Sequence, residues 1–331
     1  MTSYELMMRA IHFETPDRLP FGREHAHGVR LGLIDVERGY GKQQNVGVYD
    51  EWGCPWQRTE LLNMGYVAEH PLADWDALKT YKWPDPDNRA FYQGMEEQFA
   101  GSEGKYVTTH LFALIWERMW WLRGMNKVLV ELYTDRRRME YLADRLVEYD
   151  LAVIDNIGQR FPGRIHGMTC TDDWGSQRAT FIDPKLWCEF FQPRYAKVFE
   201  SAHAQGWDIF MHSDGKINEI IGPWIEAGLD MINITSPRLV GIEEIGERFA
   251  GRIRFWGGVD NQLTLPTATR EEIREEVRLL LTHWSTPEGG YIVSGYGTSD
   301  EDDEGRQAIG LPAWKLKVME DAFREFDPYR R

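Results

Sequence analysis

Cysteine is scarce in this chain of 331 residues, which contains only Cys54, Cys170 and Cys188. No two of them have Cys-x-x-Cys spacing. Because the number is odd and the chain is long, we do not expect a disulfide framework, and a reducing compartment fits this composition better. The cysteines therefore predict a cytoplasmic protein.

Basic residues are also few, since 38 Lys and Arg stand against 53 Asp and Glu, for a formal net charge of −15. A strongly negative protein repels phosphate backbones and anionic membrane surfaces. The charge argues against nucleic acid and against a membrane as partners. We expect a small-molecule substrate instead.

Long apolar runs are missing as well. No segment approaches the roughly 18 apolar residues that a membrane span needs, and residues 1–11 lack the apolar core of a signal peptide. Hydrophobic residues make up 42% of the chain and charged residues 27%, which is an ordinary globular composition. The chain is long enough to bury a large core.

From about residue 105 onward, short β-rich runs alternate with longer segments of helical period. The predicted strands are 105–110, 164–170, 207–212, 229–234, 253–257 and 290–294, with a further candidate at 17–21. Helices are expected at 135–161 and after a capping box formed by Thr269 and Glu272. This alternation is typical of a parallel sheet wrapped by helices and predicts an α/β fold, a (β/α)₈ barrel of the TIM type.

Residues 35–100 fit this alternation poorly because they are rich in Gly, Trp, Asp and Pro. We interpret them as an irregular insertion near the barrel mouth, within a single domain that spans residues 1–331. Trp52, in this insertion, is a candidate aromatic wall for a planar ligand, although most tryptophans are explained by packing in the core.

In a (β/α)₈ barrel the chemistry lies at the carboxyl ends of the strands, where the βα loops converge. Polar side chains follow nearly every predicted strand of this chain. In chain order they are Arg23, His25 and His27, then His110, Asp172 and Asp173, His212 and Asp214, Asn233, Asp260, and Tyr296. Arg23, His25, His27, Trp52, His110, Asn233 and Asp260 are the predicted substrate-binding residues, and Asp172, Asp173, His212, Asp214 and Tyr296 the predicted catalytic ones.

Several of these residues have more than one possible role. His212 can serve as a general acid or base, as a neutral metal ligand, or as a partner of a backbone carbonyl. Asp214 can act in catalysis or cap the helix that follows. Asp172 and Asp173 can divide their pKa values between an acid and an anion, or one can cap a helix. Adjacent loop residues have no fixed period, so the sequence leaves open which of the two faces the pocket.

Several short segments follow one another along the chain in a recognisable order. They are residues 9–20 (RAIHFETPDRLP), 50–54 (DEWGC), 116–118 (WER), 122–124 (LRG), 172–177 (DDWGSQ), 212–215 (HSDG), 226–230 (EAGLD) and 257–260 (GGVD). These segments and their order resemble the uroporphyrinogen decarboxylase-like superfamily. The resemblance covers nearly the whole chain. It implies a (β/α)₈ barrel, a homodimer, and either porphyrinogen decarboxylation or methyl transfer with a corrinoid protein.

Two departures from the superfamily's patterns bear on the reaction. Where the decarboxylases carry an arginine-rich segment, residues 21–28 offer one arginine and two histidines, and where they carry a late histidine this chain has Tyr296. Where the thiol-methylating branch has a His-x-Cys zinc motif and a later cysteine, this chain has His212-Ser213-Asp214 and Ser294-Gly295-Tyr296. Zinc bound by His212 and Asp214 is still compatible with known donor types.

The resemblance and its departures favour a methyltransferase of the corrinoid-associated kind that demethylates a small methoxylated or methylated compound. The corrinoid would come from a partner protein, because no corrinoid-binding domain is recognisable in this chain. A decarboxylase acting on a small or aromatic acid is the second hypothesis. A barrel that binds a ligand without turnover is the third.

Overall fold

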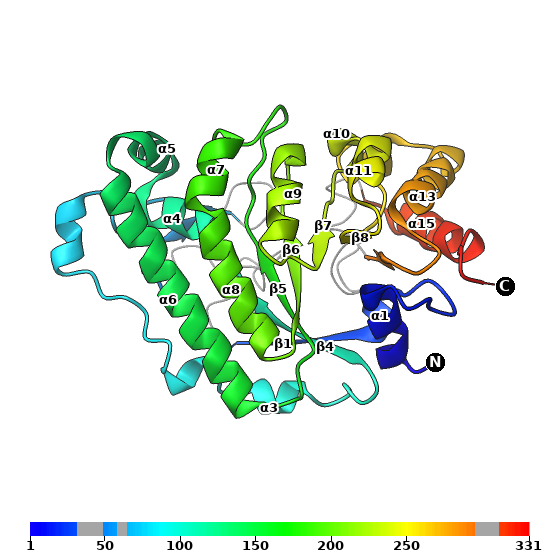
Figure 1. The fold of residues 1–331 in the computed structure, drawn as a ribbon, viewed down its shortest axis with the longest axis horizontal. Coiled ribbons are helices and arrows are strands. Elements are labelled where there is room, and N and C mark those ends of the chain that lie inside the picture. Colours follow the sequence, from blue (N-terminus) through cyan, green and yellow to red (C-terminus); the bar gives the residue numbers. More distant parts are fainter. Residues whose placement is uncertain (32–48, 58–64, 295–310, 331) are drawn as a thin grey trace.

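The computed structural model describes residues 1–31, 49–57, 65–294 and 311–330. Its centre is a parallel sheet of seven strands in the order β1-β4-β5-β6-β7-β8-β9 (Figure 1). The strands are β1 (Ala26–Arg30), β4 (Tyr106–Leu111), β5 (Gly167–Thr171), β6 (Asp208–His212), β7 (Met231–Asn233), β8 (Arg254–Gly257) and β9 (Tyr291–Val293). All six strands predicted from residue 105 onward are present, which confirms the α/β barrel class.

The sheet closes on itself through the segment before β1. Phe21 forms a parallel bridge with Val293 of β9, and the backbone N–H of Val293 donates to the carbonyl of Pro20. Phe21 is therefore the only residue of the predicted strand 17–21 that pairs with the sheet, and that prediction was wrong in its extent. The strand that pairs with β4 begins five residues later, after the single helical turn α2 (Gly22–His25).

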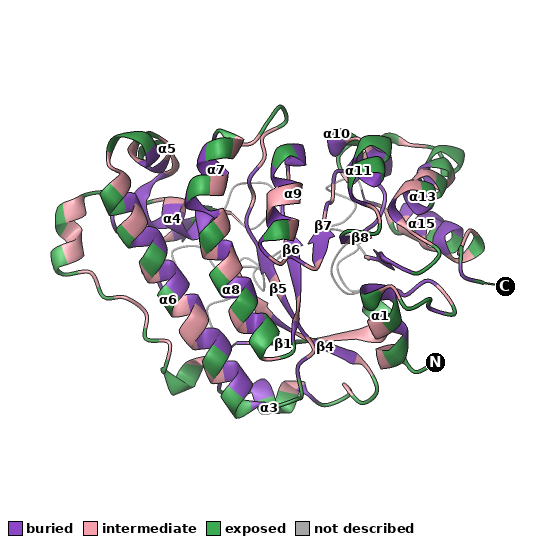
Figure 2. Ribbon diagram, viewed as in Figure 1, coloured by how far each residue is buried: buried purple, intermediate pink, exposed green. Residues whose placement is uncertain are grey.

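Helices follow the strands and cover the outside of the sheet. They are α4 (Trp116–Arg123), α5 (Met125–Thr134), α6 (Arg136–Arg160), α7 (Pro184–Phe190), α8 (Gln192–Ala204), α9 (Asn218–Glu226), α10 (Pro237–Val240), α11 (Ile242–Phe249), α12 (Thr264–Thr267), α13 (Arg270–Trp284) and α15 (Ala313–Glu325). Their buried sides face the strands and their exposed sides face outward (Figure 2). None of the helices in the described ranges is long and apolar enough to cross a membrane.

Two predicted helix boundaries are confirmed in detail. Asp135 caps α6 by accepting from the backbone N–H of Arg138. Thr269 and Glu272 form the predicted reciprocal capping box at the start of α13. The three cysteines are free.

The region 35–100 is described only over residues 49–57 and 65–100. It contains the hairpin of β2 (Trp56–Gln57) and β3 (Tyr66–Val67), the 3₁₀ turns η3 (Trp75–Lys79) and η4 (Arg89–Phe91), and α3 (Met95–Gln98). Trp52 packs between Arg118 of α4 and Tyr149 of α6. The segment between η3 and α3 runs alongside α6, and α3 contacts β1 (Figure 1).

The interior of the barrel is divided into two halves. The N-terminal half is an apolar cluster in which Met7, Ala10 and Ile11 of α1 (Ser3–His12) pack against side chains of the sheet, namely Tyr106, Phe210, Met231 and Ile292. Helix α1 therefore closes the N-terminal end of the barrel. At the carboxyl end the inward side chains are polar and half-buried, which makes this end the place to look for a functional site.

Candidate functional site

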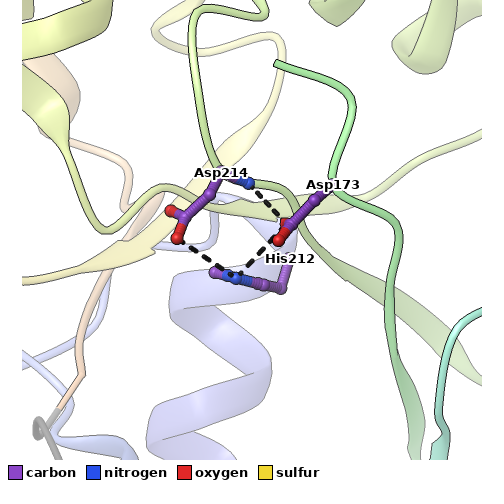
Figure 3. A group of neighbouring side chains, drawn as sticks. All are labelled: Asp173, His212 and Asp214. Atoms are coloured by element: carbon purple, nitrogen blue, oxygen red, sulfur yellow. Dashed lines mark hydrogen bonds and ion pairs between the residues drawn. The ribbon is translucent and has the colours of Figure 1, made fainter. Parts of the chain in front are cut away.

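Three predicted site residues converge at the carboxyl ends of β5 and β6. Nε2 of His212 lies 3.7 Å from Oδ1 of Asp173 and 3.9 Å from Oδ2 of Asp214 (Figure 3). One donor atom from each of the three residues lies within 4.8 Å of the other two, and no other such group of histidine, cysteine or acidic residues occurs in the part of the chain that the structure describes. The three side chains are 28%, 44% and 35% exposed, so the cluster is open to solvent.

The local sequence holds the two loops of this cluster close together. The backbone N–H of Asp214 donates to Oδ1 of Asp173 at 2.8 Å. Gly175 and Gly215 touch across the loops, and a Cβ on Gly175 would lie 2.5 Å from the Gly215 backbone. Gly215 also has φ of +87°, which side chains rarely adopt. Gly175 and Gly215 therefore allow the two loops that carry Asp173 and Asp214 to approach each other.

Asn233 on β7 sets the tautomer of His212. The Asn233 Nδ2 group donates to the backbone carbonyl of Trp256, so its Oδ1 faces His212. Nδ1 of His212 lies 2.7 Å from this oxygen and must carry the proton, because the oxygen can only accept. In the neutral ring, Nε2 therefore presents its lone pair toward Asp173 and Asp214. This is how metal-ligating histidines are held in proteins.

The two carboxylates differ in their surroundings. The Thr235 hydroxyl donates to Oδ1 of Asp214 and leaves Oδ2 directed at His212. Desolvation raises the pKa of Asp173, His212 opposes this effect, and the Asp214 carboxylate adds to it. An imidazole nitrogen and two carboxylate oxygens that lie this close together form a donor set that Zn²⁺ accepts. Asp173, His212 and Asp214 are the residues that could hold a metal.

Asp172 faces away from the cluster, which answers a question that the sequence left open. Its buried carboxylate accepts from the backbone N–H groups of Ile115, Trp116 and Glu117, at the start of α4, and from the Tyr195 hydroxyl at 2.6 Å. Burial raises the pKa of Asp172 to about 6, against the effect of these hydrogen bonds. Asp172 is a helix cap, so its predicted catalytic role is not supported by its position.

The other predicted residues are divided between the two ends of the barrel. Asn233 contacts His212, as described above, and His110 on β4 contacts the Thr169 hydroxyl of β5. His25 and His27 lie elsewhere: they contact Ser3 of α1 and the Gln98 carbonyl of α3. We expected them to follow a strand, but His25 is the last residue of α2 and His27 is the second residue of β1. The structure does not bring them to the cluster.

Arg23, Trp52 and Asp260 are also apart from the cluster. Arg23 is half-exposed and lies 3.8 Å from Glu320 of α15. Trp52 is buried among the helices. Asp260 is fully buried and accepts from the backbone N–H groups of Gln262 and Leu263, so it shapes the loop after β8. Tyr296 falls outside the described residues.

Glu117 and Thr235 belong to the site but were not singled out from the sequence. The Glu117 carboxyl is buried beside Thr171, and desolvation, followed by the charges of Asp173 and Asp172, raises its pKa well above the usual range. Glu117 lies in residues 116–118, one of the segments that resemble the superfamily, and this was a signal in the sequence. For Thr235 the only signal was its position two residues after Asn233.

Comparison with known proteins gives the family of this fold. The family model of uroporphyrinogen decarboxylase matches residues 122–299, which is more than half of the chain and includes all three residues of the cluster. The chain belongs to the uroporphyrinogen decarboxylase family. None of the curated proteins compared with this family member matches it.

The fold resembles that of a solved methyltransferase structure. A methyltransferase from Methanosarcina mazei superposes with a TM-score of 0.66 at 15% identity, covering 98% of this chain and 99% of that chain. An endo-β-1,4-mannanase from Thermotoga petrophila gives a TM-score of 0.45 at 9% identity, covering 99% of this chain and 75% of that chain. At 15% identity, the likeness to the methyltransferase shows a shared fold and not a shared reaction.

Proposed function

We propose that this chain is a methyltransferase of the corrinoid-associated kind, which removes a methyl group from a small methoxylated or methylated compound. The observation that carries the proposal is the open cluster of Asp173, His212 and Asp214 at the mouth of a uroporphyrinogen decarboxylase-family barrel. The corrinoid acceptor on a separate partner protein and a homodimeric assembly are parts of the same proposal.

The donor set favours an oxygen-bound methyl group over a thiol-bound one. Cys170 is buried, with its Sγ 3.5 Å from the Phe210 carbonyl oxygen and 3.8 Å from Met211 Sδ, and it is not part of the cluster. Carboxylates and imidazole are harder ligands than thiolates and suit a metal that polarises oxygen. A bound Zn²⁺ would act as a Lewis acid on the leaving oxygen.

Hydrogen bonds within the protein orient the side chains of this site. Asn233 orients His212, and Thr235 orients Asp214. The Asp214 backbone N–H holds Asp173. In the proposed reaction the C–O bond of the substrate breaks, the methyl group passes to the reduced corrinoid of the partner, and the oxygen leaves as an alkoxide or phenolate that takes up a proton from water.

The first test is the metal content of the protein purified without a metal-binding tag, for the wild type, His212→Ala and the control His203→Gln. His203 lies near the end of α8, pairs with Asp230 directly before β7, and is not part of the cluster. We expect about one zinc ion per chain in the wild type and the control, and none in His212→Ala. The metal-loaded protein is then assayed for methyl transfer to reduced corrinoid proteins across a panel of methoxy compounds. No transfer to any of them would overturn the proposal.

A decarboxylase that acts on a small or aromatic acid is the second candidate. The family match favours it, and the Asp173 carboxyl, partly exposed and directed at His212, is the group that would deliver a proton to the product. Release of CO₂ from a candidate acid, lost in Asp173→Asn, would replace the methyltransferase proposal by this one.

A further inference from the structure

An aromatic pocket lies on the outside of the barrel, where the segment between η3 and α3 runs alongside α6 (Figure 1). Its volume is about 130 Å³, and its lining residues are Trp52, Trp83, Pro84, Pro86, Arg145, Glu148 and Tyr149. None of them belongs to the Asp173–His212–Asp214 cluster. The pocket is therefore a second candidate site, separate from the one at the barrel mouth.

The aromatic rings of this pocket are steeply inclined to one another. The ring centroids of Trp52 and Trp83 are 6.4 Å apart, with an angle of 89° between the ring planes. The ring of Tyr149 lies 4.7 Å from that of Trp52, at 68°. Trp52 is buried and forms the floor, whereas Trp83 and Tyr149 are half-buried walls. Rings that enclose one space from different directions form the kind of cage that binds methylated ammonium groups.

Hydrogen bonds hold the cage in place. The Tyr81 hydroxyl donates to the backbone carbonyl of Trp52 at 2.7 Å. On the side of α6, the Asn156 side chain donates to the carbonyl of Pro86 at 3.1 Å, and the Tyr92 hydroxyl donates to the same carbonyl at 2.6 Å. The floor and the rim are thus fixed before a ligand arrives, which lowers the entropy that binding has to cost.

The rings of this region already have cations on their faces. The guanidinium carbon of Arg145 lies 5.3 Å from the centroid of Trp83, and that of Arg118 lies 5.0 Å from the centroid of Trp52. Both distances are within the range of cation–π attraction. Arg118 is buried and is paired with Asp50 at 3.0 Å, so its charge is compensated within the protein.

The rim of the pocket carries more acidic than basic groups. Arg145 is paired with Glu148 at 2.5 Å, and both side chains are partly exposed. Asp85 and Asp87, next to the two prolines of the rim, are exposed, as is Lys82. Three carboxylates therefore stand against two basic side chains around the opening. This balance favours a positively charged ligand over a negatively charged one.

We infer that this pocket binds the quaternary ammonium group of a small molecule, with the faces of Trp52, Trp83 and Tyr149 around its methyl groups and Glu148 near its charge. An apolar cavity of roughly 150 Å³ holds a benzene molecule. A trimethylammonium group is smaller than benzene and fits a pocket of about 130 Å³. The inference goes beyond the proposed function and does not depend on it.

The test compares two ligands of the same shape that differ in charge. The protein is titrated at low ionic strength with choline and with 3,3-dimethyl-1-butanol, its uncharged isostere, and binding is followed by the NMR signal of the ligand methyl groups. The variants are Trp83→Leu, which keeps an apolar wall without the aromatic ring, and Glu148→Gln. Trp314→Leu is the matched control, because Trp314 is also partly exposed and has Arg270 over its ring at 5.1 Å. Circular dichroism checks that each variant folds.

We expect choline to bind about 10-fold more tightly than dimethylbutanol, because only the cation is attracted by the ring faces. The preference should fall below about 2-fold in Trp83→Leu, weaken about 3-fold in Glu148→Gln and survive in Trp314→Leu. Absence of choline binding, equal binding of the two ligands, or a preference that persists in Trp83→Leu would overturn the inference. If Trp83→Leu does not fold, an unchanged preference in Glu148→Gln would overturn it.

Discussion

The two ends of this barrel use histidine and aspartate in opposite ways. At the N-terminal end, His12 lies 3.3 Å from Asp208 and His203 lies 2.6 Å from Asp230, and these partners raise the pKa of both histidines. At the carboxyl end, His212 stays 3.7 Å or more from its carboxylates and gives its Nδ1 proton to Asn233. One end makes close ion pairs that hold elements together, whereas the other brings a histidine and two aspartates near one another at longer distances.

The packing around each end follows the same division. The N-terminal end is closed by α1 and an apolar cluster. The charged groups at this end form ion pairs with one another. The mouth has no such closure among the described residues, and its side chains remain partly exposed. Stability and function are thus placed at opposite ends, as in other barrels of this type.

Asp172 is the largest exception to this division, because it lies at the mouth and yet serves stability. Replacing it with alanine removes the acceptor of three backbone N–H groups and of the Tyr195 hydroxyl. We expect Asp172→Ala to lower the free energy of unfolding by about 3 kcal/mol or more in urea titrations. The matched variant Asp173→Ala should change it by less than about 1 kcal/mol, and equal effects would contradict the assignment of the two roles.

Asn233 provides a finer test of how His212 is held. Asn233→Ala removes the acceptor of the Nδ1 proton and frees the imidazole to change its tautomer or rotate. Partners of this kind contribute about 10- to 100-fold to metal affinity. We expect a loss of that size in competition titrations with a chelator, with His212→Ala as the zero-affinity reference. Unchanged zinc affinity would show that Asn233 does not orient the ligand.

The N-terminal end predicts a small dependence of stability on pH. The pKa of His12 and that of His203 are raised by hydrogen bonds to Asp208 and Asp230, so their stabilisation is complete below about pH 6.5, the unfolded value, and is lost as the pH rises through the raised values. Both side chains are more than a third exposed, which limits the effect to about 0.5 kcal/mol. Unfolding curves of the metal-free protein at pH 6 and pH 8 should show this loss, and the double variant His12→Gln/His203→Gln should not.

Most of the fold could be predicted because its signals are local. Strands from β4 to β9 are short β-branched or aromatic runs between helical segments, and Asp135 and Thr269 cap helices by contacts within one turn. The prediction of the first strand was wrong for a physical reason. Leu19 and Phe21 are apolar and buried, so their segment has the pattern of a strand. The true strand β1 has a weaker pattern, because it contains Gly28 and two half-buried polar residues, and it pairs with the distant β4.

The candidate site was predicted in part. Placing His212, Asp214 and Asp173 after strands required only the alternation of elements, and the structure brings these three together. The choice between Asp172 and Asp173 depends on where α4 begins in space, since the amides of α4 bind Asp172. Asp260 also follows a strand, but its carboxylate accepts from the loop that comes after it.

The sequence by itself determined the barrel class and the supply of titratable side chains at the strand ends, because both depend on residue type and local period. Only the tertiary structure decided which of these side chains meet. The packing of the strands and loops places Asp173 beside His212 and turns Asp172 toward α4, and these are contacts between residues far apart in the chain. A local pattern carries no information about such distances, whereas the packing of the closed barrel fixes them.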